Sequence, residues 1–282
     1  MPFVKLNAPQ FMTSYRKLAV ASWGHPRDPS TYSTMELPLD EAEALLAKMT
    51  GKPQPSLTHY IALVMGHCLQ HYPQLNHLLR LGRLYPRASV DAFISTMTST
   101  ERGKDLTGFV VRDINQMGLR DFAELCEKNV QALRNNADPD MVKTQAMMER
   151  LPTWLLKPIL LFTEFLQYTL NIPLNRIGMP LDPFGSFMLT NVGALGIDNA
   201  YVPLSPYSRC PFIICVGKPR EIPVVRDGDV TVGRVVTVAM TMDHRYADGA
   251  HGAMIIRRFR KVFTRPDAYP EVFSPKGAEP RS

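Results

Sequence analysis

Residues 235–249 read VVTVAMTMDHRYADG, and this stretch contains a strand, a turn and the start of a helix. The first eight residues, 235–242, are mostly β-branched or apolar, which is typical of a buried strand. Asp248 and Gly249 then predict a tight turn into the helix, since glycine tolerates backbone angles that other residues avoid. The stretch therefore places His244 where a long strand ends and a helix follows.

The rest of the chain alternates strand and helix patterns. Runs of β-branched and aromatic residues predict strands at 88–97, 106–111, 187–190 and 212–216. Apolar residues at helical spacing predict helices at 38–49, 56–72 and 119–135, and from about 250 onward. Asp40 and Ser56 are the expected N-caps of the first two helices, and Asp227-Gly228-Asp229 favours a hairpin turn. This alternation predicts an α/β protein whose mixed sheet is covered by helices.

The composition is that of a globular protein. The 282 residues include 32 Lys and Arg against 26 Asp and Glu, and 45% of them are hydrophobic. These values exclude a disordered, collagen-like or disulfide-rich chain. Four scattered cysteines without a CxxC pair predict neither a disulfide framework nor a metal site. Because no secretory signal pattern opens the sequence, a cytoplasmic protein is expected.

The most apolar stretch is LPTWLLKPILLFTEFLQYTLNIPL, at residues 151–174. Its length matches a membrane span, but Lys157 and Glu164 interrupt it and Pro158 lies near its middle. Each charge at the centre of a bilayer costs at least about 2.5 kcal/mol, so an amphipathic helical insert is favoured. Three roles stay open for this insert: covering a pocket, contacting a membrane surface, or packing on the protein body.

The densest basic cluster is RRFRK, at residues 257–261. Ala253, Ile256, Phe259 and Phe263 around it fall on one face of a helix, which favours a solvated charged face opposite a buried one. No nucleic-acid motif accompanies the cluster, so nucleic-acid binding is not expected. An anionic small molecule also suits the positive charge.

His244 is the candidate catalytic residue. A histidine at the end of a strand is held by the sheet and can point into a cleft, and an imidazole with an ordinary pKa of about 6.5 suits proton removal at neutral pH. His251 follows at helical spacing and is not expected to be catalytic. A lone histidine is more often structural than catalytic, so the assignment of His244 as catalytic depends on the motifs around it.

These motifs resemble a known family over the second half of the chain. HRYADG at 244–249 fits the HxxxDG motif, and with Asp243 it resembles the DHRxxDGA form of the acyltransferase component of 2-oxoacid dehydrogenase complexes. GSFMLTNVGALG at 185–196 resembles that family's GxFTISNxGxxG stretch. CVGK at 215–218 and PVV at 223–225 resemble its LGVGK and PVV segments.

The resemblance extends to the first half, where YRKLA at 15–19 resembles the family's RxxIA helix and YPQLN at 72–76 its FPxLNA segment. It implies a chloramphenicol acetyltransferase-like two-layer sandwich, an α/β fold with a mixed β-sheet covered by helices. It also implies one catalytic domain over residues 1–282, with a helical insert at about 138–182 and a polar tail at about 270–282.

The resemblance implies specific roles for two residues. His244 would be the general base that deprotonates an acceptor thiol or hydroxyl, which then attacks an acyl thioester. Thr190 matches the family's hydroxyl that donates a hydrogen bond to the tetrahedral oxyanion. In this family the two groups come from different subunits of a trimer, so a homotrimer with active sites at its interfaces is expected.

Four further residues are expected to support the site. Asp248 would pair with an arginine, for which Arg16 is the candidate, and this carboxylate completes the catalytic set implied by the motif. Asn191 and Gly249 would shape the loop and the turn rather than react. No metal is implied.

The implied substrate is a coenzyme A thioester, and no tightly bound cofactor is expected. The sequence shows neither a lipoyl domain nor a subunit-binding domain, so a lipoyl group would arrive on another chain. The polar C-terminal tail differs from the short apolar end that joins trimers into shells, which favours a separate trimer.

Two other functions stay open. One is a coenzyme A-dependent O- or N-acyltransferase that acts on a small molecule, and the other is a non-catalytic trimeric scaffold. The presence of His244, Asp248 and Thr190 favours an enzyme, because a scaffold needs none of them.

Overall fold

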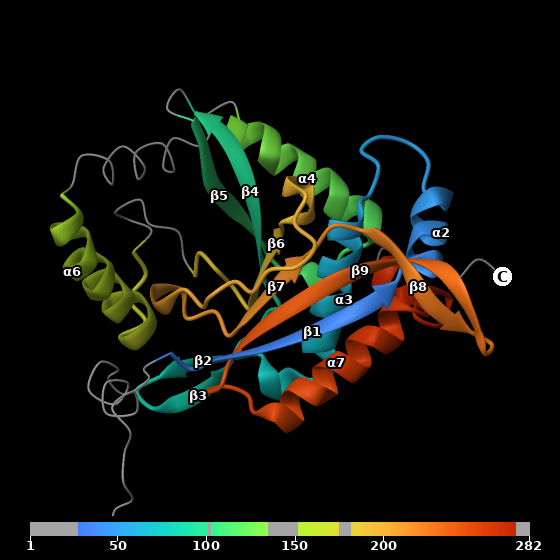
Figure 1. The fold of residues 1–282 in the computed structure, drawn as a ribbon. Coiled ribbons are helices and arrows are strands. Elements are labelled where there is room, and N and C mark those ends of the chain that lie inside the picture. Colours follow the sequence, from blue (N-terminus) through green and yellow to red (C-terminus); the bar gives the residue numbers. More distant parts are fainter. Residues whose placement is uncertain (1–27, 101–102, 135–151, 175–181, 275–282) are drawn as a thin grey trace, which may run out of the picture.

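A large mixed sheet forms the centre of the computed structural model, which describes residues 28–100, 103–134, 152–174 and 182–274 (Figure 1). The strands follow the order β1-β9-β7-β6-β4-β5, and β8 pairs with the outer part of β9. Their bounds are β1 (Ser30–Pro38), β4 (Ala92–Thr100), β5 (Gly103–Val111), β6 (Phe187–Asn191), β7 (Phe212–Val216), β8 (Arg220–Arg226) and β9 (Asp229–Asp243).

The sheet is mixed because its central strands are parallel and its outer strands are not. β4, β6 and β7 run parallel to one another, whereas β5, β9 and β1 each run antiparallel to the strands beside them. All five residues of β7 are buried, as expected of a strand at the centre of a covered sheet. The expected mixed β-sheet is therefore confirmed.

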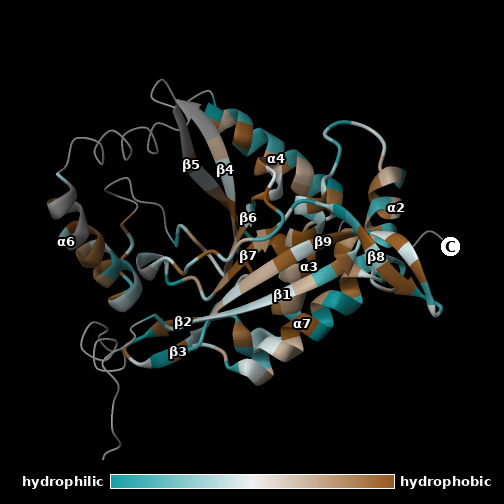
Figure 2. Cartoon of the chain, in the orientation of Figure 1, coloured by the Kyte–Doolittle hydropathy of each residue, from teal (hydrophilic) through white to brown (hydrophobic). Residues whose placement is uncertain are grey.

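Helices pack against this sheet to form the second layer. They are α2 (Asp40–Lys48), α3 (Leu57–His71), α4 (Leu119–Arg134), α7 (Gly249–Phe263) and α8 (Pro270–Phe273). α3 is the most buried of them and contacts the other four. Figure 2 shows α3 mostly hydrophobic, whereas hydrophobic and hydrophilic turns alternate along α7. The contrast follows from position, because α3 is buried inside the helical layer whereas α7 lies at its surface.

Smaller elements gather at the end of the sheet where β9 finishes (Figure 1). β2 (His77–Arg80) and β3 (Arg83–Pro86) form a hairpin of their own. The expected insert contains α6 (Thr153–Glu164) and a π-helical turn, η3 (Phe165–Thr169), which contacts β2. Among the described residues, no helix is both long and apolar enough to cross a membrane.

Several expected boundaries differ from the structure: the strands predicted at 88–97, 106–111 and 235–242 are β4, β5 and β9 with other bounds, and two further boundaries differ for reasons of packing. The N-cap of α2 is Leu39 rather than Asp40, because Leu39 is fully buried and its amide donates to the carbonyl of Arg234 on β9. The polar tail begins later than about 270, since residues 270–273 form α8, with Val272 and Phe273 buried in the core. In both places tertiary packing determines the boundary.

Candidate active site

His244 follows β9 directly and begins a turn that is held on two sides. The amide of His244 donates to the carbonyl of Pro29, just before β1, at 2.9 Å. The amide of Asp243 donates to the carbonyl of Pro211, just before β7, also at 2.9 Å. The side chain of His244 is exposed in the single chain. The structure therefore fixes the main chain of His244 and leaves its imidazole accessible.

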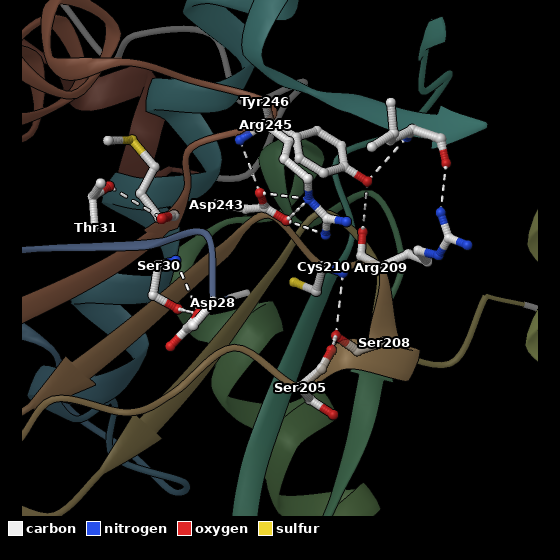
Figure 3. Close-up of polar contacts among 12 residues, drawn as sticks. Asp28, Ser30, Thr31, Ser205, Ser208, Arg209, Cys210, Asp243, Arg245 and Tyr246 are labelled. Carbon is white, nitrogen blue, oxygen red and sulfur yellow. Dashed lines mark hydrogen bonds and ion pairs between the residues drawn. The ribbon is translucent and has the colours of Figure 1, made fainter. Parts of the chain in front are cut away.

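The carboxylate of Asp243 is buried and stabilises this turn by accepting hydrogen bonds from Arg245. It is only 4% exposed and receives hydrogen bonds from the amide of Arg245 at 2.9 Å and from its guanidinium, with Nη2 at 2.6 Å from Oδ2. Figure 3 shows the guanidinium folded back onto the carboxylate. This hydrogen bonding raises the pKa of Arg245. The amides of Tyr246 and Ala247 both donate to the carbonyl of Asp243, so the whole turn is anchored to one residue.

Asp248 ends the turn as the N-cap of α7. Its Oδ1 accepts from the amides of Ala250 and His251, each at 3.0 Å, and its own amide donates to the His251 ring in a capping box. These hydrogen bonds, with the one from His251 foremost, lower the pKa of Asp248. Its expected partner Arg16 lies outside the described residues, so the ion pair between them stays a prediction.

Gly249 was expected to form a tight turn through backbone angles that other residues avoid, and this reason is wrong. Gly249 is the first residue of α7 and does not have a positive φ, and a Cβ placed on it would meet no described atom within 4 Å. The turn therefore does not need a glycine there. The side chain of Asp248 turns the chain by capping the helix instead.

Thr190 and Asn191 lie at the end of β6, on the other side of β7. The Nδ2 of Asn191 donates to the hydroxyl of Thr58 at 2.8 Å, and its Oδ1 accepts from the amide of Ala194 at 3.2 Å. Asn191 thus holds the start of the loop that follows through its contact with Ala194. Thr190 is partly buried and pairs with Cys215 in the ladder.

Thr190 and His244 do not meet within one chain. Thr190 is level with Cys215 of β7, which is level with Ala239 of β9, and His244 comes 244 − 239 = 5 residues later. At about 3.3 Å per residue, that step alone separates the two along the strands by about 17 Å. Two strand spacings add to the distance. A hydroxyl and an imidazole so far apart cannot act on one carbonyl group.

Sequence reasoning missed a group of side chains behind the turn. The hydroxyl of Tyr246 accepts from the amide of Leu79 at 3.0 Å, and its ring points toward Arg209 (Figure 3). Arg209 forms an ion pair with Glu164 and donates through Nη1 to the carbonyl of Leu79 at 3.1 Å. No periodicity or motif joins these residues, which come from separate parts of the chain. The sequence therefore carries no signal that could have grouped them.

Comparison with known proteins supports the resemblance. Residues 184–269 match the model of the family described as 2-oxoacid dehydrogenases acyltransferase (catalytic domain). Over 82 residues the chain is 33% identical to the dihydrolipoyllysine-residue acetyltransferase component of the pyruvate dehydrogenase complex of Rickettsia felis. This match covers 29% of the chain but only 19% of that protein, so it spans about a fifth of the curated relative's length.

Solved structures extend the likeness to the whole fold. A probable dihydrolipoamide acetyltransferase from Listeria monocytogenes aligns with a TM-score of 0.60 and 14% identity, over 97% of this chain and 98% of that one. The cubic core of a pyruvate dehydrogenase multienzyme complex aligns with a TM-score of 0.61 and 17% identity, over 94% of each chain. Residues 184–269 therefore resemble the catalytic domain of the 2-oxoacid dehydrogenase acyltransferases, and the chain has the fold of these two solved proteins.

Proposed function

We propose that the protein is an acyltransferase that moves an acyl group between coenzyme A and a thiol such as dihydrolipoamide, with His244 as general base. The observation that carries this proposal is the placement of His244, whose main chain is held from two sides while its side chain is exposed. The family match over residues 184–269 supports acyl transfer as the reaction.

The reaction needs one proton acceptor and one oxyanion donor. His244 takes the proton of the acceptor S–H, and the sulfur attacks the carbonyl carbon of the acyl thioester. A C–S bond forms, and the carbonyl π electrons move to oxygen, where the Thr190 hydroxyl donates a hydrogen bond. When the carbonyl re-forms, the bond to the coenzyme A sulfur breaks, and the departing thiolate takes the proton from His244.

The two groups are proposed to come from different copies of the chain. The separation of Thr190 and His244 across the sheet supports this arrangement, since one chain cannot bring both to the same carbonyl. In a cyclic trimer each interface joins two different surfaces, so three equivalent sites result. The lipoyl group would then be supplied by a separate domain or chain.

A transfer assay tests the reaction. Acetyl coenzyme A and free dihydrolipoamide are incubated with the protein, and formation of the new thioester is followed, with His244→Ala as the control. Transfer that is lost in the variant is the expected result. Turnover on an alcohol or amine with an inert dithiol would instead support the small-molecule acyltransferase. No transfer from a panel of acyl coenzyme A donors to any acceptor would overturn the proposal.

A mixing experiment tests the shared site. His244→Ala and Thr190→Val chains are each expected to be nearly inactive, but unfolded and refolded together they form mixed trimers. After random mixing at a 1:1 ratio, about a quarter of all interfaces, counted over mixed and unmixed trimers, pair an intact His244 with an intact Thr190. Recovery of about that fraction of activity is expected, whereas no recovery would show that both groups act within one chain.

A further inference from the structure

Tyr246 ties the turn that carries His244 to two distant segments. Its side chain is buried, at 7% exposure, and lies two residues beyond His244. The hydroxyl accepts from the amide of Leu79 on β2 at 3.0 Å and lies 3.5 Å from the carbonyl of Arg209, at the outer limit of a hydrogen bond. A shift of either segment would therefore move the turn.

Arg209 fixes the position of both segments. Its main chain has a φ of 52°, in the left-handed region that residues other than glycine adopt only when surrounding contacts require it. Its side chain supplies such contacts, through Nη1 to the carbonyl of Leu79 and through Nε to Glu164. Leu79 thus uses its amide for Tyr246 and its carbonyl for Arg209, and the three residues form one unit.

Glu164, which belongs to the insert, joins the unit of Tyr246, Leu79 and Arg209 through its ion pair with Arg209. It is the last residue of α6, and its side chain is only 13% exposed, so its charge is poorly solvated without Arg209. Glu164 is therefore connected to Tyr246, two residues beyond His244, through Arg209 and Leu79.

We propose that Glu164 is a positioning residue of the active site, which holds the His244 turn in place through Arg209 and Tyr246. The insert is then a part of the catalytic apparatus rather than a segment that merely packs on the protein body. This inference rests on the proposed function of His244.

The chain offers a matched control for the test. Asp182, beyond α6 and η3, forms an ion pair with Arg87 and accepts from Tyr168, so it anchors the same region at another point. Among the described residues, the hydrogen bonds and ion pair of Asp182 go to Arg87 and Tyr168, and none joins it directly to the His244 turn. Asp182→Asn and Glu164→Gln each replace an anchoring carboxylate with a neutral side chain of the same shape, but only Glu164→Gln should affect His244.

Two measurements distinguish a Glu164 that positions the His244 turn from one that only attaches the insert to the protein body. Glu164→Gln should lower kcat about 10-fold to 100-fold with little change in KM for the acyl coenzyme A, since small displacements of a catalytic group have effects of this size. Tyr246→Phe should give a similar loss, and the double variant should lose little more than either single one, because both act through Arg209. Asp182→Asn should keep the wild-type kcat.

The second measurement does not depend on activity. Amide hydrogen exchange of the peptide covering residues 243–248, followed by mass spectrometry, should be faster in Glu164→Gln than in the wild type and unchanged in Asp182→Asn. Equal exchange in all three proteins, or equal kcat in Glu164→Gln and Asp182→Asn, would overturn the inference. If the wild type transfers no acyl group, the proposed function fails, and the exchange result alone decides the positioning role. Should Glu164→Gln not fold, Tyr246→Phe is measured in its place by the same two methods, with the same outcomes expected.

Discussion

Thr190 and His244 each lie at the carboxyl end of a strand, but β6 and β9 run in opposite directions on either side of β7, so the two residues lie toward opposite ends of the sheet. This separation is a consequence of the ladder register, which places Thr190 level with Ala239, five residues before His244. Neither a rotamer change nor a loop movement closes a gap of about 17 Å along a sheet. Catalysis that uses both side chains therefore requires at least two copies of the chain.

Replacing His244 by alanine should reduce kcat about 10²-fold to 10⁴-fold, the usual effect of removing a positioned base. The melting temperature should stay close to that of the wild type, because the imidazole is exposed and only the main chain of His244 is held by neighbours. Steady-state kinetics measures the expected loss of kcat, and thermal denaturation measures whether the melting temperature is unchanged. A variant with full activity would revive the scaffold hypothesis.

The Thr190→Val variant keeps the shape of the side chain and removes its hydroxyl. If this hydroxyl stabilises the oxyanion, kcat should fall about 10²-fold to 10³-fold. Thr190→Ser, which retains a hydroxyl, serves as the matched control and should keep much of the activity. Equal rates for the valine and serine variants would show that Thr190 is a strand residue with no chemical role.

Asp248 should make a pH-dependent contribution to stability. Its pKa is lowered in the folded state, so its stabilising effect is complete above the pKa of the unfolded chain, near pH 4, and is lost as the pH falls through the lowered value. Asp248→Ala should therefore melt below the wild type at neutral pH, with the difference shrinking in acid. Thermal melts across this range check the sign, and a difference that grows on acidification would contradict it.

Two glycines near the site should respond in opposite ways to alanine. A Cβ on Gly217 would clash with the carbonyl oxygen of Asp198, a backbone atom that cannot move aside cheaply. Gly217→Ala should therefore destabilise the protein by about 1 to 3 kcal/mol or more. Gly249→Ala, with open space around it and a helical position, should be neutral or slightly stabilising. Urea denaturation of both variants measures the difference, and equal stabilities would show that the local contacts at Gly217 relax freely.

Local pattern predicted several elements well. β7 has the expected bounds, Ser56 is the N-cap of α3, and Asp227 and Gly228 both adopt positive φ in the turn between β8 and β9. These features depend on neighbouring residues alone. A buried strand, a cap and a hairpin turn are therefore readable from a few consecutive side chains.

The buried face of α7 was predicted less well. Helical spacing suggested a face through Ala253, Ile256, Phe259 and Phe263, but Ala253 and Ile256 are only partly buried. The fully buried residues are Gly252, Ile255, Phe259, Val262 and Phe263. Periodicity defines a stripe on a helix, whereas its centre depends on what the helix packs against. That partner, formed by α3 and the sheet, is known only from the fold.

The sequence by itself determined the α/β class, several central strands and helices, and the positions of His244 and Thr190 in their motifs, because each follows from residues close together in the chain. Only the tertiary structure decided that these two side chains lie apart in one copy, and that Glu164 reaches Arg209 across 45 positions. Strand register and ion pairs between distant segments depend on how the whole chain packs, and no local pattern encodes them.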